Sequence, residues 1–272
     1  VLQCHTPGMH RHLDALVEGF KLALGDVLVG VYDKSAKTLA KNGGVPSEDG
    51  WVWGKAPGNH KALEYGNQYF IDWEKGQKTG FFLDQRENRA LLGSLSKGKK
   101  VLNIFSYTGG FSISALSAGA SEVHSLDSSA RALEVCEENV RLNGMDVSKH
   151  KSIQADALEY LKTENLSEYD IVVLDPPAFA KRASARHAAV QGYKRINLRA
   201  LSMMKSGSLL FTFSCSQAVD DALFTNTIVA AAIQARRTVR IMHRLHQPPD
   251  HPVNVFHPEG SYLKGLVLRI DD

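Results

Sequence analysis

The chain has few cysteines and no long apolar run. Its three cysteines, Cys4, Cys136 and Cys215, are far apart and odd in number, so they form neither a disulfide framework nor a cysteine-rich metal site. No apolar stretch approaches the roughly 20 residues that span a bilayer, and the start of the chain lacks the basic-then-apolar pattern of a signal peptide. We therefore expect a protein of the reducing cytoplasm, with no membrane partner and no bound metal.

Acidic residues are missing from one segment. None lies between Asp175 and Asp220, although the 272-residue chain has a net charge of only +3. Residues 176–249 carry 11 basic and 2 acidic residues, against 19 and 23 in residues 1–175. Such a segment is typical of a surface that binds nucleic-acid phosphates, although a solvated helix face has the same composition. The cations of interest are Lys181, Arg182, Arg186, Lys194, Arg195 and Arg199.

From residue 100 onward, short apolar strands alternate with helices. The predicted strands are Val101–Phe105, Glu122–Asp127, Lys151–Gln154, Ile171–Leu174 and Ser208–Phe213. This alternation predicts an α/β domain with a parallel sheet. Thr238–His243 and Leu263–Ile270 predict a closing antiparallel pair.

The chain before this region has a mixed pattern. We predict a helix at His12–Leu24 and strands at Asp26–Tyr32, Ala62–Phe70 and Phe81–Leu83. The expected domains are a small, partial α+β domain at residues 1–72 and an α/β domain at residues 73–272.

A glycine turn, Ser106–Gly110, follows the first strand of the predicted sheet. Its glycines allow close approach of a ligand, and the next helix offers unpaired N–H groups. The spacing is not G-x-G-x-x-G, so an ordinary structural turn is an alternative. Asp127 ends the second strand, where a ribose is usually held, and Asp156 ends the third, where it can bind an adenine amino group. Each aspartate can equally cap a helix, but three such signals at successive strand ends predict a cofactor site.

Two prolines make the end of the fourth strand stiff. Asp175, Pro176 and Pro177 form a turn without backbone donors, which can present a carboxylate to a base edge. Phe179 can stack on that base. A plain structural corner is the alternative.

Cys215 lies between two serines at the end of the fifth strand. Reactive thiols collect at such positions, and a following helix N-terminus can lower a thiol pKa. A buried core thiol is the usual alternative, which we expect for Cys4 and Cys136.

Taken together, six motifs closely resemble the bacterial 23S ribosomal RNA cytosine-C5 methyltransferase I family. The motifs are Gly76–Arg86, Asn103–Phe111, Asp175–Phe179, Gly192–Lys194, Phe213–Ser216 and His257–Lys264. The resemblance implies a Rossmann-like class I methyltransferase sheet behind a partial N-terminal α+β domain. Family members usually carry an RNA-binding PUA domain ahead of that part, and we expect this chain to be without it.

The resemblance also implies S-adenosyl-L-methionine as cofactor and a role for each motif residue. The implied cofactor residues are Gln85, Arg86, Asn103, Ser106, Tyr107, Thr108, Gly109, Gly110, Asp127, Ser128, Asp156, Ala157 and Asp175. From the motifs and the basic segment together, the predicted substrate residues are Lys78, Pro176, Pro177, Phe179, Lys181, Arg182, Tyr193 and Lys194. Cys215 is then the nucleophile, and Asp175 is the acid that contacts the base.

These observations predict an enzyme that forms 5-methylcytosine in RNA, with 23S ribosomal RNA as the partner. An N-methyltransferase acting on guanine or adenine is the first alternative, because it shares Asp-Pro-Pro and needs no thiol. An RNA-binding module without catalysis is the second. A requirement for Cys215 distinguishes the first alternative, and cofactor binding distinguishes the second. A homodimer is compatible with the sequence.

Overall fold

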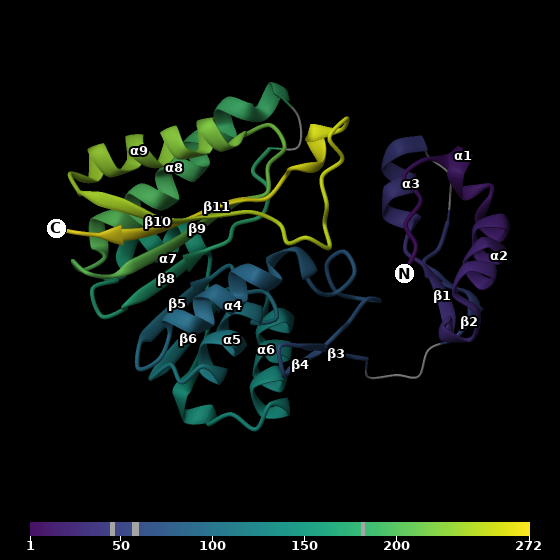
Figure 1. Ribbon diagram of the computed structural model, residues 1–272, viewed down its shortest axis with the longest axis horizontal. Helices are drawn as coiled ribbons and strands as arrows, with labels where there is room; N and C mark the ends of the chain where they lie inside the picture. The colour runs from purple at the N-terminus through teal and green to yellow at the C-terminus, as the bar shows by residue number, and fades with distance from the viewer. Residues whose placement is uncertain (44–46, 56–59, 181–182) are drawn as a thin grey trace. The chain divides into compact units, whose positions relative to one another are not determined.

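Seven strands form one sheet in the computed structural model, in the order β10-β11-β9-β8-β5-β6-β7 (Figure 1). Strands β9, β8, β5, β6 and β7 pair in parallel, and β11 runs antiparallel to both β9 and β10. The predicted parallel sheet is confirmed, and β11 inserts between β9 and β10. The strands are β5 (Lys100–Ile104), β6 (Glu122–Asp127), β7 (His150–Gln154), β8 (Ile171–Leu174), β9 (Leu209–Ser214), β10 (Val239–Leu245) and β11 (Lys264–Ile270).

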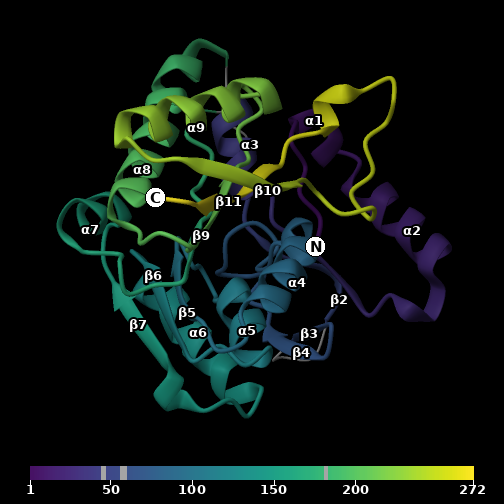
Figure 2. The same ribbon diagram turned by 60° about the vertical axis from the view of Figure 1, so that its left-hand side comes forward.

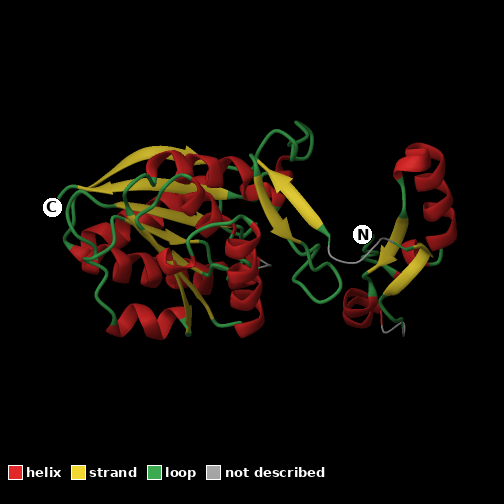
Figure 3. Cartoon of the chain, turned by 90° about the horizontal axis from the view of Figure 1, so that it is seen from below, coloured by secondary structure: helices red, strands yellow, loops and turns green. Residues whose placement is uncertain are grey.

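Helices cover both faces of this sheet (Figures 2 and 3). One face carries α4 (Arg86–Leu95), α5 (Gly110–Ser117) and α6 (Ala130–Leu142), and the other carries α7 (Ala157–Thr163), α8 (Arg186–Met203) and α9 (Asp221–Ala235). Alternate side chains of one strand feed the two cores, as expected for a strand buried on both sides. In β8, Val172 and Leu174 join the core under α8 and α9, whereas Ile171 and Val173 join the core under α4 and α5.

The structure describes residues 1–43, 47–55, 60–180 and 183–272, which divide into two compact units. Unit 1 is Val1–Ala62 with Phe70–Phe81, and unit 2 is Leu63–Tyr69 with Phe82–Asp272. The boundary expected after residue 72 therefore falls inside the second segment of unit 1. Within the described ranges, no helix combines the length and the apolarity needed to cross a bilayer.

Unit 1 contains an antiparallel pair of strands and three helices. Its elements are α1 (Pro7–His10), α2 (Leu13–Leu24), β1 (Gly30–Asp33), α3 (Ala36–Gly43) and β2 (Gly50–Gly54). Short 3-10 turns in the described part of the chain are Gly25–Val27, Leu83–Gln85, Val147–Lys149, Ala183–Ala185 and Pro258–Gly260.

Two strand predictions near the unit boundary are wrong. The segment Ala62–Phe70 is not one strand but the hairpin of β3 (Lys61–Glu64) and β4 (Asn67–Phe70). Tyr65 and Gly66 have φ values of 48° and 84°, the left-handed pair that a two-residue hairpin turn requires. Phe81–Leu83 is not a strand either, because the Phe82 carbonyl accepts from the Gln85 N–H and closes a 3-10 turn that leads into α4.

Candidate active site

The sequence motifs meet at the carboxyl edge of the large sheet. Ser106 follows β5, Asp127 ends β6, Asp175 follows β8 and Cys215 follows β9. The chain leaves β5 for β6 on one side, while β8 pairs with β5 on the other. The strand order therefore reverses between β5 and β8, and open α/β sheets bind ligands at such a switch point.

The glycine turn packs directly against α6 and α4. Gly109 has φ 82°, and a Cβ there would lie 2.2 Å from the Cys136 Sγ. A Cβ on Gly110 would lie 3.1 Å from the Arg89 Cδ. Asn139 of α6 donates its Nδ2 to the Thr108 carbonyl at 2.9 Å. Close packing thus requires glycine at 109, and the turn is held in place from behind.

Asp127 holds the same turn from the side. Its Oδ2 accepts the Tyr107 N–H at 2.9 Å, and its Oδ1 accepts the Ser129 N–H at 2.9 Å. The alternative that Asp127 caps α6 is wrong, because Ser129 is the N-cap and accepts from the Ala132 N–H. The adjacent Ser128 is exposed. Asp127 therefore joins the ends of β5 and β6, with its carboxylate partly exposed at the sheet edge.

Asp156 behaves as a helix cap. Its Oδ1 accepts the N–H groups of Leu158 and Glu159 at 2.8 and 3.0 Å, and so it begins α7. The capping alternative is confirmed for Asp156, and its predicted role near the adenine stays a prediction. Ala157, the first residue of α7, is buried beside it.

Two buried polar atoms near the turn have no hydrogen-bond partner among the described residues. They are the Ser106 Oγ and the Asn103 Oδ1, in residues that are 5% and 1% exposed. The Asn103 Nδ2 donates to the Ser112 Oγ at 2.9 Å. Unpaired buried polar atoms are rare in proteins. These atoms, together with the N-terminus of α5, fit a polar ligand of the kind that the motifs predict.

Gln85 and Arg86 connect the start of α4 to other loops of the site. The buried Gln85 donates its Nε2 to the Asp175 Oδ2 at 3.1 Å and accepts from the Asn88 Nδ2 at 2.6 Å. Arg86 forms ion pairs with Glu87 and Asp250, and hydrogen bonds to these carboxylates raise its guanidinium pKa. Gln85 thus orients Asp175, whereas Arg86 holds the loop that follows β10 through its ion pair with Asp250.

Cys215 differs sharply from the other two cysteines. Cys4 and Cys136 are buried, and burial raises the pKa of Cys136 to about 12. Cys215 is partly exposed. Its two neighbours are held in place, because the Ser214 Oγ accepts the Ser216 N–H at 3.3 Å and the Ser216 Oγ lies 2.9 Å from the Tyr193 hydroxyl.

The sequence did not single out three residues of this site, which are Asp84, Tyr262 and Lys264. Lys264, only 2% exposed, donates its Nζ to the carbonyls of Ser216 and Tyr262 at 2.8 and 2.7 Å. The Tyr262 hydroxyl donates to the Asp84 Oδ2 at 2.7 Å, and burial together with Asp84 raises the tyrosine pKa. Tyr262 and Lys264 lie in the motif His257–Lys264, but only the placement of β11 beside β9 reveals their neighbours.

Two predicted substrate residues, Tyr193 and Pro176, have buried side chains. The Tyr193 side chain is 0% exposed, so it supports Ser216 from the core and offers no surface to RNA. Phe179 packs its ring 4.7 Å from the Tyr193 ring and closely over Gly192, while remaining partly exposed.

The remaining predicted substrate residues fall in different places. Pro177 is exposed, and Lys194 is partly exposed on α8. Lys78 is exposed in unit 1, where its φ is 48°. Lys181 and Arg182 lie outside the described residues.

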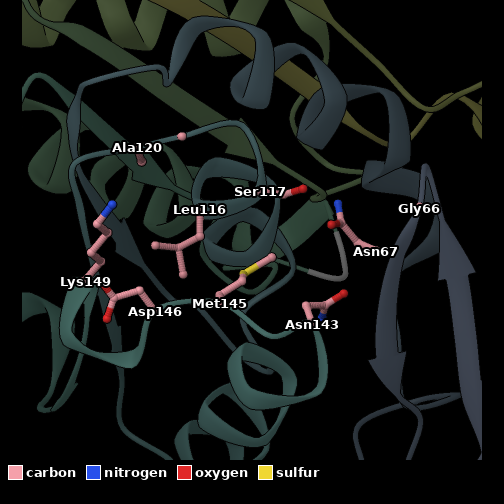
Figure 4. Close-up of a pocket in the computed structure, with 10 residues that line it drawn as sticks. Gly66, Asn67, Leu116, Ser117, Ala120, Asn143, Met145, Asp146 and Lys149 are labelled. Atoms are coloured by element: carbon pink, nitrogen blue, oxygen red, sulfur yellow. The ribbon is translucent and has the colours of Figure 1, made fainter.

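Two hollows lie elsewhere in unit 2. One, of about 360 Å³, is lined by the ends of α5 and α6 and by the turn of the β3–β4 hairpin (Figure 4). It includes Leu116, Asn143 and Lys149, which precede the starts of β6 and β7 and so lie at the opposite, amino edge of the sheet. The other, of about 390 Å³, lies between Asp221 of α9 and the loop after β10. The second hollow is therefore on the same edge as Cys215.

Comparison with known proteins identifies the chain. A family model described as S-adenosylmethionine-dependent methyltransferase matches residues 41–269. The chain belongs to this family of methyltransferases. Two relatives of the methyltransferase, both named Ribosomal RNA large subunit methyltransferase I, come from Shewanella denitrificans and Escherichia coli. They are 39% and 37% identical to it over 99% of the chain and 68% of their own length. The family and the cofactor predicted from the motifs are confirmed.

Solved structures agree with this assignment. A methyltransferase from Streptococcus mutans has 24% identity and a TM-score of 0.84, with 98% of this chain and 68% of that chain covered. A second methyltransferase structure, SMU.776 complexed with SAH, has 25% identity and a TM-score of 0.82, with 96% and 66% covered. The predicted Rossmann-like methyltransferase fold is therefore confirmed.

Proposed function

We propose that this methyltransferase forms 5-methylcytosine in 23S ribosomal RNA, with Cys215 as its nucleophile. The observation that carries the proposal is the placement of Cys215: a partly exposed thiol at the end of β9. Leu174 pairs with Thr212 across β8 and β9, so Asp175 and Cys215 follow neighbouring strands at one edge. The names of the relatives supply the ribosomal RNA, and the motif resemblance supplies cytosine C5.

The Cys215 thiol supplies the nucleophile that activates C5 of cytosine for methylation. Cytosine C5 is a poor nucleophile, and addition of the Cys215 thiolate at C6 forms a C–S bond and makes C5 enamine-like. S-adenosyl-L-methionine, when bound, supplies an electrophilic methyl group to C5. A base then removes the C5 proton, the C–H electron pair re-forms the C5=C6 double bond, and the C6–S pair returns to the Cys215 thiolate.

Asp175 relieves the charge that addition creates. Negative charge develops on N3 of the ring when the thiolate attacks C6, and a protonated carboxyl or a hydrogen bond at N3 offsets it. Gln85 fixes one oxygen of Asp175 through its Nε2. We assign Asp175 as the group that contacts N3.

The cofactor is held, in this proposal, by the turn that follows β5. Ser106 and Asn103 contribute the two unpaired buried polar atoms, and Gly109 and Gly110 allow close approach. Asp127 adds a carboxylate at the end of β6. The target cytosine must leave its stack at a cost of about a few kcal/mol, which phosphate contacts along α8 offset. We expect the reaction to take place in the cytoplasm, where Cys215 stays reduced.

RNA carrying 5-fluorocytosine at the target tests the nucleophile. Fluorine cannot leave as a proton does, so the wild-type protein should remain covalently attached and migrate with the RNA on a denaturing gel. Cys215→Ser should abolish methylation and trapping while still binding the cofactor. Cys136→Ser, in the buried thiol, should retain both activities. Near-normal turnover of Cys215→Ser would replace the C5 mechanism with methylation of a base nitrogen.

A further inference from the structure

Lys264 is a buried cation beside the proposed nucleophile. It is the first residue of β11 and pairs with Ser214 of β9, the residue before Cys215. Its Nζ lies 2.8 Å from the carbonyl oxygen of Ser216, the residue after Cys215. The ammonium is therefore fixed to the backbone just after the thiol, while the lysine backbone pairs with the residue just before it, in a residue that is 2% exposed.

Burial of an ammonium lowers the stability of the folded protein unless a negative charge lies close to it. Lys264 has no carboxylate within salt-bridge distance among the described residues, and its two recorded acceptors are neutral carbonyls. Burying an ammonium without a close anion destabilises its charged form. An apolar side chain at position 264 would avoid that cost. The presence of lysine there therefore indicates a function that needs its positive charge.

The groups near this ammonium come from two segments besides the loop of Cys215. Asp220 and Asp221 lie at the start of α9, and Tyr262, which precedes β11, accepts a hydrogen bond from the Nζ through its carbonyl. Burial lowers the pKa of Lys264, while negative charge at Asp221, Cys215 and Asp220 acts in the opposite direction. Charge coupling is reciprocal: if a thiolate at Cys215 favours the ammonium, the ammonium favours the thiolate.

The N-terminus of α9 does not supply this positive charge. The helix begins at Asp221, six residues after Cys215, and its cap Asp220 accepts the Leu223 N–H at 2.8 Å. Both aspartates disfavour a thiolate. The start of α9 is therefore not the positive charge that we consider for Cys215.

We infer that Lys264 is a positioning residue that holds Cys215 in its reactive thiolate form and fixes the Ser214–Ser216 loop around it. The inference rests on the proposed role of Cys215 as nucleophile. The thiolate is the attacking species, and the same charge makes Cys215 a better leaving group when the C6–S bond breaks.

The test measures the thiolate directly. Cys215 in the full chain is alkylated with iodoacetamide across pH, and its modification is followed by peptide mass spectrometry, so that Cys4 and Cys136 do not interfere. A neighbouring opposite charge lowers the pKa of an acid by about 1–3 units, so Lys264→Met should raise the alkylation midpoint by about one unit or more. Lys264→Arg, which keeps the charge, should stay close to wild type.

Lys100→Met is the matched control. Lys100 also begins a strand of the same sheet and has two acceptors for its Nζ, Glu122 and Glu168, at 2.8 and 2.7 Å. It lies at the opposite, amino edge, because it starts β5. Its loss should leave the Cys215 midpoint unchanged.

An unchanged midpoint in folded Lys264→Met overturns the inference, since a purely structural lysine would not move the thiol pKa. If that variant does not fold, a reciprocal measurement decides. The Lys264 pKa, followed by NMR of ¹³C-labelled lysine, should fall in Cys215→Ser, and an unchanged value overturns the inference. Loss of methylation in Cys215→Ser with an unshifted thiol in Lys264→Met would reject the lysine role and keep the nucleophile. Retained methylation in Cys215→Ser would reject the nucleophile itself.

Discussion

The two halves of the sheet edge hold their polar groups in different ways. In the cofactor half, after β5, β6 and β7, side chains bind the backbone over shorter separations: Asp127 accepts N–H groups 20 and 2 positions away, and Asp156 caps α7. In the nucleophile half, after β8 and β9, contacts join residues far apart in the chain. Tyr262 reaches Asp84 across 178 positions, and Gln85 reaches Asp175 across 90.

This difference has a consequence for function. The shorter-range contacts make the cofactor half a preformed site, whose turn is held mainly by β6, α4 and α6. The nucleophile half depends on correct packing of α4, α8, β9 and β11 together, so its chemistry is sensitive to residues that touch no substrate. Substitutions in the two halves should therefore fail in different ways: loss of cofactor affinity in one, and loss of turnover in the other.

Asp175→Asn should give the largest difference between the two halves, because it removes the acid and keeps the shape of the side chain. General acid catalysis contributes about 10²–10⁴-fold, so single-turnover methylation at saturating cofactor should slow by about that factor. Calorimetry should show cofactor affinity close to wild type. The opposite pattern, with weakened cofactor binding and normal kcat, would move Asp175 into the cofactor half.

Asp127→Ala should give the opposite signature. Its loss leaves the N–H groups of Tyr107 and Ser129 unpaired and removes a carboxylate from the cradle, so cofactor affinity should weaken by about 1–3 kcal/mol. Asp146→Ala is a matched control, because the Asp146 Oδ1 likewise accepts the N–H two residues on, from Ser148 at 3.0 Å. Asp146 lies at the amino edge, and its loss should leave cofactor binding unchanged. Unchanged affinity in folded Asp127→Ala would remove Asp127 from the cofactor site.

The same contrast explains what the sequence could predict. The strands, the glycine turn and the strand-end aspartates are local patterns, and the structure brings Ser106, Asp127 and Asp175 to one edge as expected. The sequence alone did not show which strand-end residues cap helices. The structure shows that Ser129 caps α6 and that Asp156 caps α7.

The nucleophile half could not be predicted in full, because its contacts depend on strand order. A basic residue at 264 has no visible link to Cys215 until β11 is known to lie antiparallel to β9. Tyr193 was misplaced for a similar reason: on a basic helix an aromatic residue resembles an RNA contact, but its position on the inner face of α8 buries it completely.

RNA affinity along α8 should change least, and the change shows how far the nucleophile half extends over the surface. The helix follows β8, so it begins near the carboxyl edge and runs away from it. Arg186 and Arg199 are both exposed on this helix, and at 1.5 Å per residue they lie about 20 Å apart along its axis.

Arg186→Glu should weaken RNA binding and reduce the slope of log affinity against log salt by about 0.7–0.9 per lost phosphate contact. Arg199→Glu, with the same charge change at the far end, should do so much less. Equal losses would mean that RNA tracks the whole helix, and unchanged slopes in both would make this basic segment a solvated face.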